Sequence, residues 1–338
     1  MLRLPIRAIL PAVALAAVAI PTAGCGGSGG GGASNAANVQ PAPPSAQLAA
    51  AEHPAIGDFP APQGRTLRKL AGTLLAGPNV ALATTAYAPG RNRLAFGLVG
   101  ADGSFIYGKT AIYIARTPDG RAQGPFLAPA DSLQVRPPFR SHTTDPGDVK
   151  AVYYANVDLP GEGRWYVLAI TRAGAQLVGG TNVVDVGRSG AGIVAVGDPA
   201  PRIDTPTLAS VGGDAAKIDT RTPPDTMHGV SLKNVLGKRP VMLLFSTPAL
   251  CQSRVCGPVT DIAEQLKTVY GDKVAFIHNE VYVDNDPNKG LRPQLKAFGL
   301  SSEPWLFAID RHGRVAARLE GAFGFDEFKA AVAAAQRG

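Results

Sequence analysis

The chain has 338 residues and a net charge of +7, from 33 Lys and Arg against 26 Asp and Glu, yet only 17% of its residues are charged. This length suits two domains of ordinary size. The basic residues form no run, no basic helix and no alternation with aromatic residues, so nucleic-acid binding has little support and attraction to an anionic membrane surface explains the charge more simply. The histidines are scattered, with no pair at a zinc-ligand spacing, and are His53, His142, His228, His278 and His312.

The first 25 residues have the layout of a signal peptide. Arg3 and Arg7 precede an apolar run at 8–20 that is too short for a comfortable membrane span. The sequence Thr22-Ala23-Gly24-Cys25 then resembles a bacterial lipobox, which implies that Cys25 is lipidated and becomes the new N-terminus. The alternative is an ordinary cleaved signal.

Residues 26–64 are rich in Gly, Ala, Pro and Ser and predict a disordered, flexible tether. No later run is long or apolar enough to span a bilayer. The sequence therefore predicts an extracytoplasmic body that a lipid anchor holds at the cell membrane.

Residues 65–190 predict an all-β domain. Turn signals such as Pro89-Gly90 and Asp102-Gly103 separate short strands, expected at 80–85, 93–99, 111–116, 151–157, 165–170 and 182–186. This spacing favours an antiparallel sandwich. The segment 153–166, in which Trp165 follows a turn, resembles the late hairpin of immunoglobulin-like modules, so an immunoglobulin-like β-sandwich with a binding or spacer role is expected. Residues 191–224 are rich in Gly and Pro and predict an interdomain linker.

From residue 225 the pattern changes to alternating strands and helices. Residues 241–245 form a fully apolar strand, and apolar residues recur at helical spacing from 259 to 269. A strand at 274–277, a short helix near 291–298, a hairpin of 305–309 with 315–319, and a last helix from about 326 to 336 follow. This order predicts a mixed sheet covered on both faces, an α/β architecture for residues 225–338.

Cys251 and Cys256 lie between the apolar strand and the first helix of this domain. A thiol pair at such a junction is where redox chemistry is expected, because a helix N-terminus stabilises the reactive thiolate. Five positions along a helix would set the two side chains about 140° apart in azimuth and roughly 7.5 Å apart along the axis. A disulfide tolerates Cα separations up to about 7 Å, so the first helical turn must unwind or be non-helical.

Residues 225–338 resemble thioredoxin-fold domains of the redoxin kind. The resemblance is carried by the strand at 241–245, Cys251 at the nucleophile position, Pro258 where a kinking proline is expected, and Glu303-Pro304 before the hairpin. It implies that Pro304 is cis and shapes a substrate groove. It also implies that Cys251 attacks a substrate disulfide.

In the same family pattern Cys256 resolves the mixed disulfide that Cys251 forms. Glu303 would lie near Cys251 and either raise the pKa of its thiol or require a positive partner, for which Arg254 is the candidate. The resemblance thus implies a catalytic pair, a groove residue and two tuning residues.

The four residues between the cysteines depart from thioredoxins, which have two. Q-type peroxiredoxins resemble the chain in this spacing, but Thr247 lies one residue too far upstream for their pattern and their supporting arginine has no counterpart. Thiol peroxidase activity is therefore one alternative. Sco-type copper chaperones also resemble the chain, which implies a Cu(I) site of Cys251, Cys256 and His278 as another alternative.

A further alternative is a non-enzymatic envelope binding protein with a structural disulfide, since exported cysteine pairs are commonly structural. The favoured interpretation is a membrane-tethered, extracytoplasmic thiol-disulfide oxidoreductase. Its expected partners are protein thiols or disulfides of the cell envelope, and no cofactor is expected unless the copper alternative holds.

Overall fold

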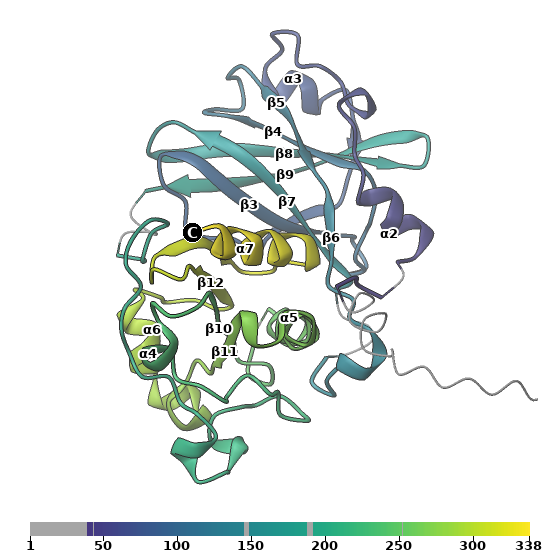
Figure 1. Ribbon diagram of the computed structural model, residues 1–338. Helices are drawn as coiled ribbons and strands as arrows, with labels where there is room; N and C mark the ends of the chain where they lie inside the picture. The colour runs from purple at the N-terminus through teal and green to yellow at the C-terminus, as the bar shows by residue number, and fades with distance from the viewer. Residues whose placement is uncertain (1–38, 43, 145–148, 188–191, 252) are drawn as a thin grey trace, which may run out of the picture.

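The computed structural model describes residues 39–42, 44–144, 149–187, 192–251 and 253–338, so the predicted signal peptide and Cys25 lie outside it. Within these ranges, a helix with the length and apolarity needed for a membrane crossing is not found. The described chain forms an N-terminal unit of two β-sheets and a C-terminal α/β unit, and helix α7 (Phe325–Arg337) lies where the two meet (Figure 1).

The N-terminal sheets have the strand orders β1-β9-β8-β4-β5 and β2-β3-β7-β6. Neighbouring strands are antiparallel except β1 and β9, which are parallel. The bounds are β1 Leu75–Ala76, β2 Asn79–Leu82, β3 Gly90–Val99, β4 Thr110–Ala115, β5 Gln123–Ala128, β6 Ala130–Ser132, β7 Ala151–Leu159, β8 Gly163–Ala173 and β9 Gln176–Val186. The six predicted strands are confirmed as β2, β3, β4, β7, β8 and β9. That this unit is immunoglobulin-like stays a prediction.

Strand β4 shows why the unit needs cover on two sides, because all six of its residues are buried. Ile112 and Ile114 face the core between the two sheets, whereas Ala111 and Tyr113 belong to a second apolar cluster on the outer face. The alternation follows from the two-residue period of a strand. The outer cluster is covered by Phe59 and by helix α3 (Leu67–Ala71).

Residues 44–64, predicted to belong to a disordered tether, are folded onto this unit. Helix α2 (Ala46–Ala51) begins at a Ser45 cap, and Leu48 and Ala51 are fully buried. The Tyr113 hydroxyl donates to the Pro60 carbonyl at 2.7 Å. The Ala- and Pro-rich composition indicated a chain without a core of its own, but this segment is stabilised by the core of the neighbouring sheets.

The C-terminal unit has one sheet of order β11-β10-β12-β13, in which β10 is parallel to β11 and antiparallel to β12. Helices α5 and α7 cover one face of the sheet, and α4 and α6 cover the other. The bounds are α4 Leu232–Val235, β10 Val241–Phe245, α5 Cys256–Tyr270, β11 Ala275–Asn279, α6 Pro293–Ala297, β12 Trp305–Ile309 and β13 Val315–Glu320. The predicted α/β order of strand, helix, strand, helix, hairpin and helix is confirmed.

Short 3-10 turns connect several of these elements: η1 Ile56–Asp58, η2 Pro137–Phe139, η4 Ala209–Val211, η5 Ala215–Lys217, η6 Gly271–Lys273, η7 Val283–Asn285 and η8 Pro287–Lys289. Two of them, η4 and η5, lie within residues 192–224, the described part of the predicted linker. There the Ala200 amide donates to the Gly313 carbonyl, and Asp219 and Arg221 are 4% and 5% exposed. This segment is thus a packed extension of the α/β unit rather than a free linker, because composition indicates irregular backbone but not whether that backbone packs.

The two units share one apolar core. Ala95, Leu133 and Val152 of the N-terminal unit belong to the same buried cluster as Leu306 and Phe328 of the α/β unit. Burial of this kind is the main stabilising contribution to a fold, so the two units are expected to be held together as one body.

Candidate functional site

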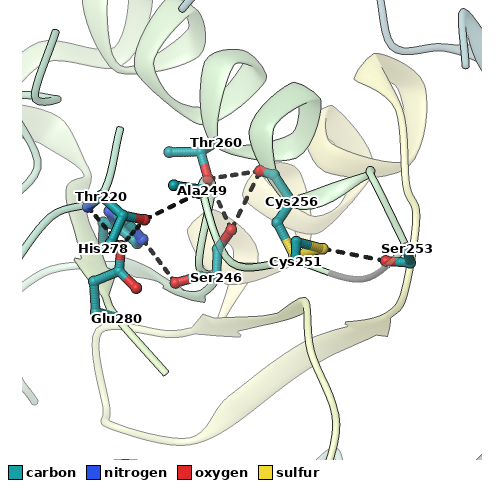
Figure 2. Close-up of a disulfide and its surroundings, with 9 residues drawn as sticks. All are labelled: Thr220, Ser246, Ala249, Cys251, Ser253, Cys256, Thr260, His278 and Glu280. Atoms are coloured by element: carbon teal, nitrogen blue, oxygen red, sulfur yellow. Dashed lines mark hydrogen bonds between the residues drawn. A yellow bond between two sulfur atoms is a disulfide. The ribbon is translucent and has the colours of Figure 1, made fainter. Parts of the chain in front are cut away.

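Cys251 and Cys256 form a disulfide with a Cα separation of 6.0 Å (Figure 2). Helix α5 begins at Cys256, so Cys251 and the residues after it lie ahead of the helix. Arg254 in this loop has a left-handed backbone, with φ of 58°. Cysteines five positions apart can therefore be bridged because residues 253–255 lie outside the helix, one of the two outcomes expected from helix geometry.

The two sulfur atoms differ in surroundings. Cys256 is fully buried, and its carbonyl accepts hydrogen bonds from the hydroxyls of Ser246, at 3.2 Å, and Thr260, at 2.8 Å. Cys251 is half-buried, and its Sγ lies 3.2 Å from the Oγ of the exposed Ser253. Cys256 is thus fixed between the end of β10 and the first turn of α5, whereas Cys251 lies where a partner can reach it.

Pro304 lies next to this junction. Register places Trp305 opposite Phe245, the last residue of β10, and the Glu303–Pro304 peptide bond is cis, as the family resemblance implies. Burial, followed by the charge of Glu280, raises the pKa of the Glu303 carboxyl. In the described structure no ion pair joins Glu303 to Arg254, so the expected tuning pair is not formed; Arg254 belongs to the non-helical loop instead.

His278 does not face the sulfur atoms. Its Nδ1 lies 2.7 Å from the Asp225 carboxylate, and its Nε2 donates to the Ser246 carbonyl at 3.1 Å, so both ring nitrogens are engaged. Burial opposes the charged imidazolium, but the charge and hydrogen bond of Asp225 outweigh it and raise the pKa of His278. The contacts of His278 in the described structure thus go to Asp225 and Ser246 rather than to the cysteines, and the Cu(I) site of His278 with Cys251 and Cys256 stays a prediction.

A cavity of about 370 Å³ lies beside the disulfide loop. Ser253 and Val255 line it from the loop, and Ser302 and Glu303 line it from the segment before Pro304. Strands β2, β3 and β7 of the N-terminal unit form another wall, with Phe105, which is 40% exposed. No sequence pattern predicts this wall, because it arises from the packing of the two units.

Gly321 lies in this wall, where its backbone contacts Ala83 of the N-terminal unit. A Cβ atom there would collide with the Ala83 carbonyl, and the residue has φ of 68°. Only glycine adopts this backbone without strain, so Gly321 allows β13 to end against the N-terminal unit.

A second buried polar cluster was missed by the sequence analysis. Asp219, Asp225 and His228 come from the segment before β10, and they surround His278 of β11. Because these residues come from separated parts of the chain, no metal-ligand spacing exists in the sequence to reveal them.

No family model and no curated protein matches the chain. Among solved structures, the chain is similar to a protein from Chlorobium tepidum described as the thiol:disulfide interchange protein DsbE, with a TM-score of 0.30 and 17% identity over 42% of this chain and 98% of that chain. A likeness at this TM-score carries no weight for function, which is inferred below from the geometry of the site.

Proposed function

We propose that the protein is a thiol-disulfide oxidoreductase in which Cys251 forms the mixed disulfide with a partner and Cys256 resolves it. The observation that carries this proposal is the asymmetry of the disulfide: a half-buried cysteine in a loop is bonded to a fully buried cysteine at the start of a 15-residue helix. A purely structural disulfide has no need of this asymmetry.

Exchange follows from this geometry. A thiolate of the partner attacks Sγ of Cys251, a new bond forms between these two sulfur atoms, and the Cys251–Cys256 bond breaks with its electron pair on Sγ of Cys256. The leaving thiolate then lies at the N-terminus of α5, where the unpaired amide groups of the first turn stabilise negative charge. A second thiolate of the partner attacks the partner's sulfur in the mixed disulfide, and that bond breaks with its electron pair on Sγ of Cys251, so the partner is oxidised and the Cys251/Cys256 pair is reduced. In the reverse direction the Cys251 thiolate attacks a disulfide of the partner, and the Cys256 thiolate then attacks Sγ of Cys251, which resolves the mixed disulfide and leaves the partner reduced.

The cavity beside the disulfide supports a role for the N-terminal unit. Its wall from β2, β3 and β7 faces the Cys251–Cys256 loop, so a partner that reaches Cys251 would contact both units. The immunoglobulin-like unit is proposed to bind the partner rather than to act only as a spacer. Lipidation of Cys25 is proposed to hold the protein outside the cytoplasm, where partners are protein thiols and disulfides of the envelope.

Trapping of mixed disulfides tests the assignment of the two cysteines. Cys256→Ser leaves Cys251 able to form a mixed disulfide but removes the thiol that resolves it, so we expect disulfide-linked adducts with envelope proteins on non-reducing gels, identified by mass spectrometry. Cys251→Ser is the matched control and should give none. Equal trapping by both variants, or by neither, would exclude this assignment.

Peroxide consumption distinguishes the proposed oxidoreductase from the alternative of a thiol peroxidase. If the chain were a thiol peroxidase, hydrogen peroxide would be consumed rapidly by the reduced wild type and not by Cys251→Ser. The proposed oxidoreductase instead exchanges disulfides with the partners trapped by Cys256→Ser and consumes peroxide only slowly.

A further inference from the structure

Two carboxylates and two imidazoles converge in the α/β unit, apart from the disulfide. Asp219, Asp225, His228 and His278 are all buried, and one possible ligand atom from each lies within 4.8 Å of the others. Three of these residues come from the segment that precedes β10, and His278 comes from β11, so the fold brings together residues that are distant in sequence.

His228 has no satisfactory partner for its ring. It is 5% exposed, and neither ring nitrogen makes a hydrogen bond. Its Nε2 points between the two carboxylates, at 3.5 Å from an oxygen of Asp219 and 3.5 Å from an oxygen of Asp225. A buried polar group without a hydrogen bond is costly, so a group that accepts the lone pair of Nε2 is missing from this position.

The other three side chains are held in place by hydrogen bonds. Every oxygen of the two carboxylates already has one partner, so an ion would bind through the remaining lone pairs of these oxygens. The Arg221 and Asp225 amides donate to Asp219, and the Met227 amide donates to Asp225. Nε2 of His278 donates to the Ser246 carbonyl, which directs Nδ1 toward the carboxylates. Such contacts are the ones that orient the ligands of a metal ion.

The distances fit a tetrahedral ion. Metal–ligand bonds of about 2.0–2.1 Å to nitrogen and oxygen give ligand–ligand distances of about 3.4 Å in a tetrahedron. Nε2 of His228 lies 3.5 Å from one oxygen of Asp219 and 3.5 Å from one oxygen of Asp225, and Nδ1 of His278 lies 3.9 Å from the other oxygen of Asp219. One ligand atom from each residue can be chosen within 4.8 Å of the others, so the side chains must draw together by about 1 Å around an ion. The 2.7 Å contact of His278 with Asp225 is shorter and must lengthen when an ion enters.

The charges also fit a divalent cation. As metal ligands both imidazoles are neutral, so the two aspartates would give the four ligands a total charge of −2. Arg221, two residues after Asp219, pairs with Asp261 at 2.8 Å and so does not neutralise the cluster. A divalent ion would neutralise it and release to solvent the proton that His278 shares with Asp225.

We propose that Asp219, Asp225, His228 and His278 bind one divalent transition-metal ion of the Zn²⁺ class through two oxygens and two imidazole nitrogens. Imidazole ligands favour Zn²⁺ and its neighbours over Mg²⁺ or Ca²⁺. With four protein ligands the site has no open position, so its role is structural: the ion fixes the segment before β10 against β11.

Zinc binding by the full chain tests this site. The disulfide is kept oxidised so that the cysteines cannot bind metal, resident metal is removed with a chelator, and inorganic Zn²⁺ is added during equilibrium dialysis. We expect one bound Zn²⁺ per folded chain and a melting temperature that rises with the Zn²⁺ concentration. His228→Asn should lose stoichiometric binding, whereas His312→Asn, at an exposed turn, should retain it.

Cobalt keeps the test informative if His228→Asn does not fold. Co²⁺ bound to the oxidised wild-type chain should give the visible absorption of a tetrahedral ion with nitrogen and oxygen ligands, without thiolate charge transfer. Absence of both Zn²⁺ and Co²⁺ binding at micromolar metal would overturn the site. Undiminished Zn²⁺ binding by folded His228→Asn, or a thiolate signal with cobalt, would overturn it as well.

Discussion

The proposed function can be tested at single residues, because Cys251 is half-buried and Cys256 is fully buried. In the reduced protein we expect iodoacetamide to alkylate Cys251 at least about tenfold faster than Cys256, since a buried thiol is inert and an accessible thiolate is reactive. Quenched labelling followed by peptide mass spectrometry gives both rates. Under denaturing conditions the two rates should converge, and faster labelling of Cys256 in the folded chain would reverse the proposed roles.

Some side chains of the site could be predicted from the sequence and others could not. The positions of Cys251 and Cys256 at a strand-to-helix junction follow from local pattern alone, because strand and helix are adjacent in the chain. No ion pair joins Arg254 to Glu303 among the described residues, because the direction of a side chain in a loop, here with φ of 58° at Arg254, cannot be predicted from the sequence. The contact of His228 with the aspartates depends on how a Gly- and Pro-rich segment packs. Such packing cannot be predicted from one sequence, because the segment has no periodic pattern of apolar residues.

At the scale of elements, the start of helix α7 depends on strand β6. Both carboxylate oxygens of Asp131 accept backbone hydrogen bonds, from Asp326 and from Glu327, each at 2.9 Å. A Cβ atom at Gly324 would collide with Asp131, so the glycine allows the strand to approach the helix. A residue of the N-terminal unit thus caps a helix of the α/β unit.

The buried carboxyl of Asp131 predicts a pH dependence of stability. Burial, followed by the charge of Glu327, raises the pKa of Asp131 to about 7. In the unfolded chain an Asp has a pKa of about 3.9. Between about pH 4 and 7 the unfolded chain has therefore lost a proton that the folded chain keeps, so the free energy of unfolding falls as the pH rises. Asp131→Asn should remove this loss, which is on the order of 2–4 kcal/mol in the free energy of unfolding.

Urea unfolding between pH 4 and pH 7 measures this difference. The charged and titratable groups that face Asp131, namely Glu327, Asp326, Arg93 and Tyr154, are unchanged in the variant and contribute to both curves. Asp326→Asn is the matched control. Because Asp326 is exposed, this substitution should leave the dependence of the free energy of unfolding on pH nearly unchanged. Parallel curves for wild type and Asp131→Asn would show that Asp131 titrates normally in the fold.

The elements of the α/β unit were predictable because each is a periodic, strongly apolar segment. Strand β10 is a continuous apolar run, and helix α5 repeats apolar residues about every 3.6 positions. Strands β5 and β6 were not predicted, for two different reasons. Strand β5 contains Gly124-Pro125, which interrupts a strand pattern, whereas β6 is only three residues long and includes the charged Asp131. Their pairing partners, distant in sequence, determine that they are strands.

At the scale of the whole molecule, the two units are joined by a buried ion pair as well as by a shared apolar core. Arg93 of β3 pairs with Glu327 of α7 at 2.6 Å, and the same guanidinium donates to the carbonyls of Glu320 and Ala322. Breaking a buried pair of this kind is costly because one charge is left without a partner. The cavity beside the disulfide therefore has a fixed wall from the N-terminal unit.

If this wall binds the partner, Phe105 contributes binding energy there. Phe105 is 40% exposed and lies over Gly97 at the cavity, so Phe105→Ala should leave the melting temperature almost unchanged while apolar contact with a partner is lost. We expect KM for a disulfide-bonded protein substrate to rise about 3–10-fold, with a smaller effect on kcat, because the contact is remote from the sulfur atoms.

Leu208→Ala provides the control for this change. Leu208 is an exposed residue of similar exposure, 43%, in the segment before β10, and it is not part of the cavity wall. Steady-state reduction of a protein disulfide by the two variants gives KM and kcat for each. If the KM of Phe105→Ala equals that of Leu208→Ala, partners approach Cys251 without contacting the N-terminal unit, and that unit acts only as a spacer. A rise in KM confined to Phe105→Ala means that both units form one binding surface for the partner.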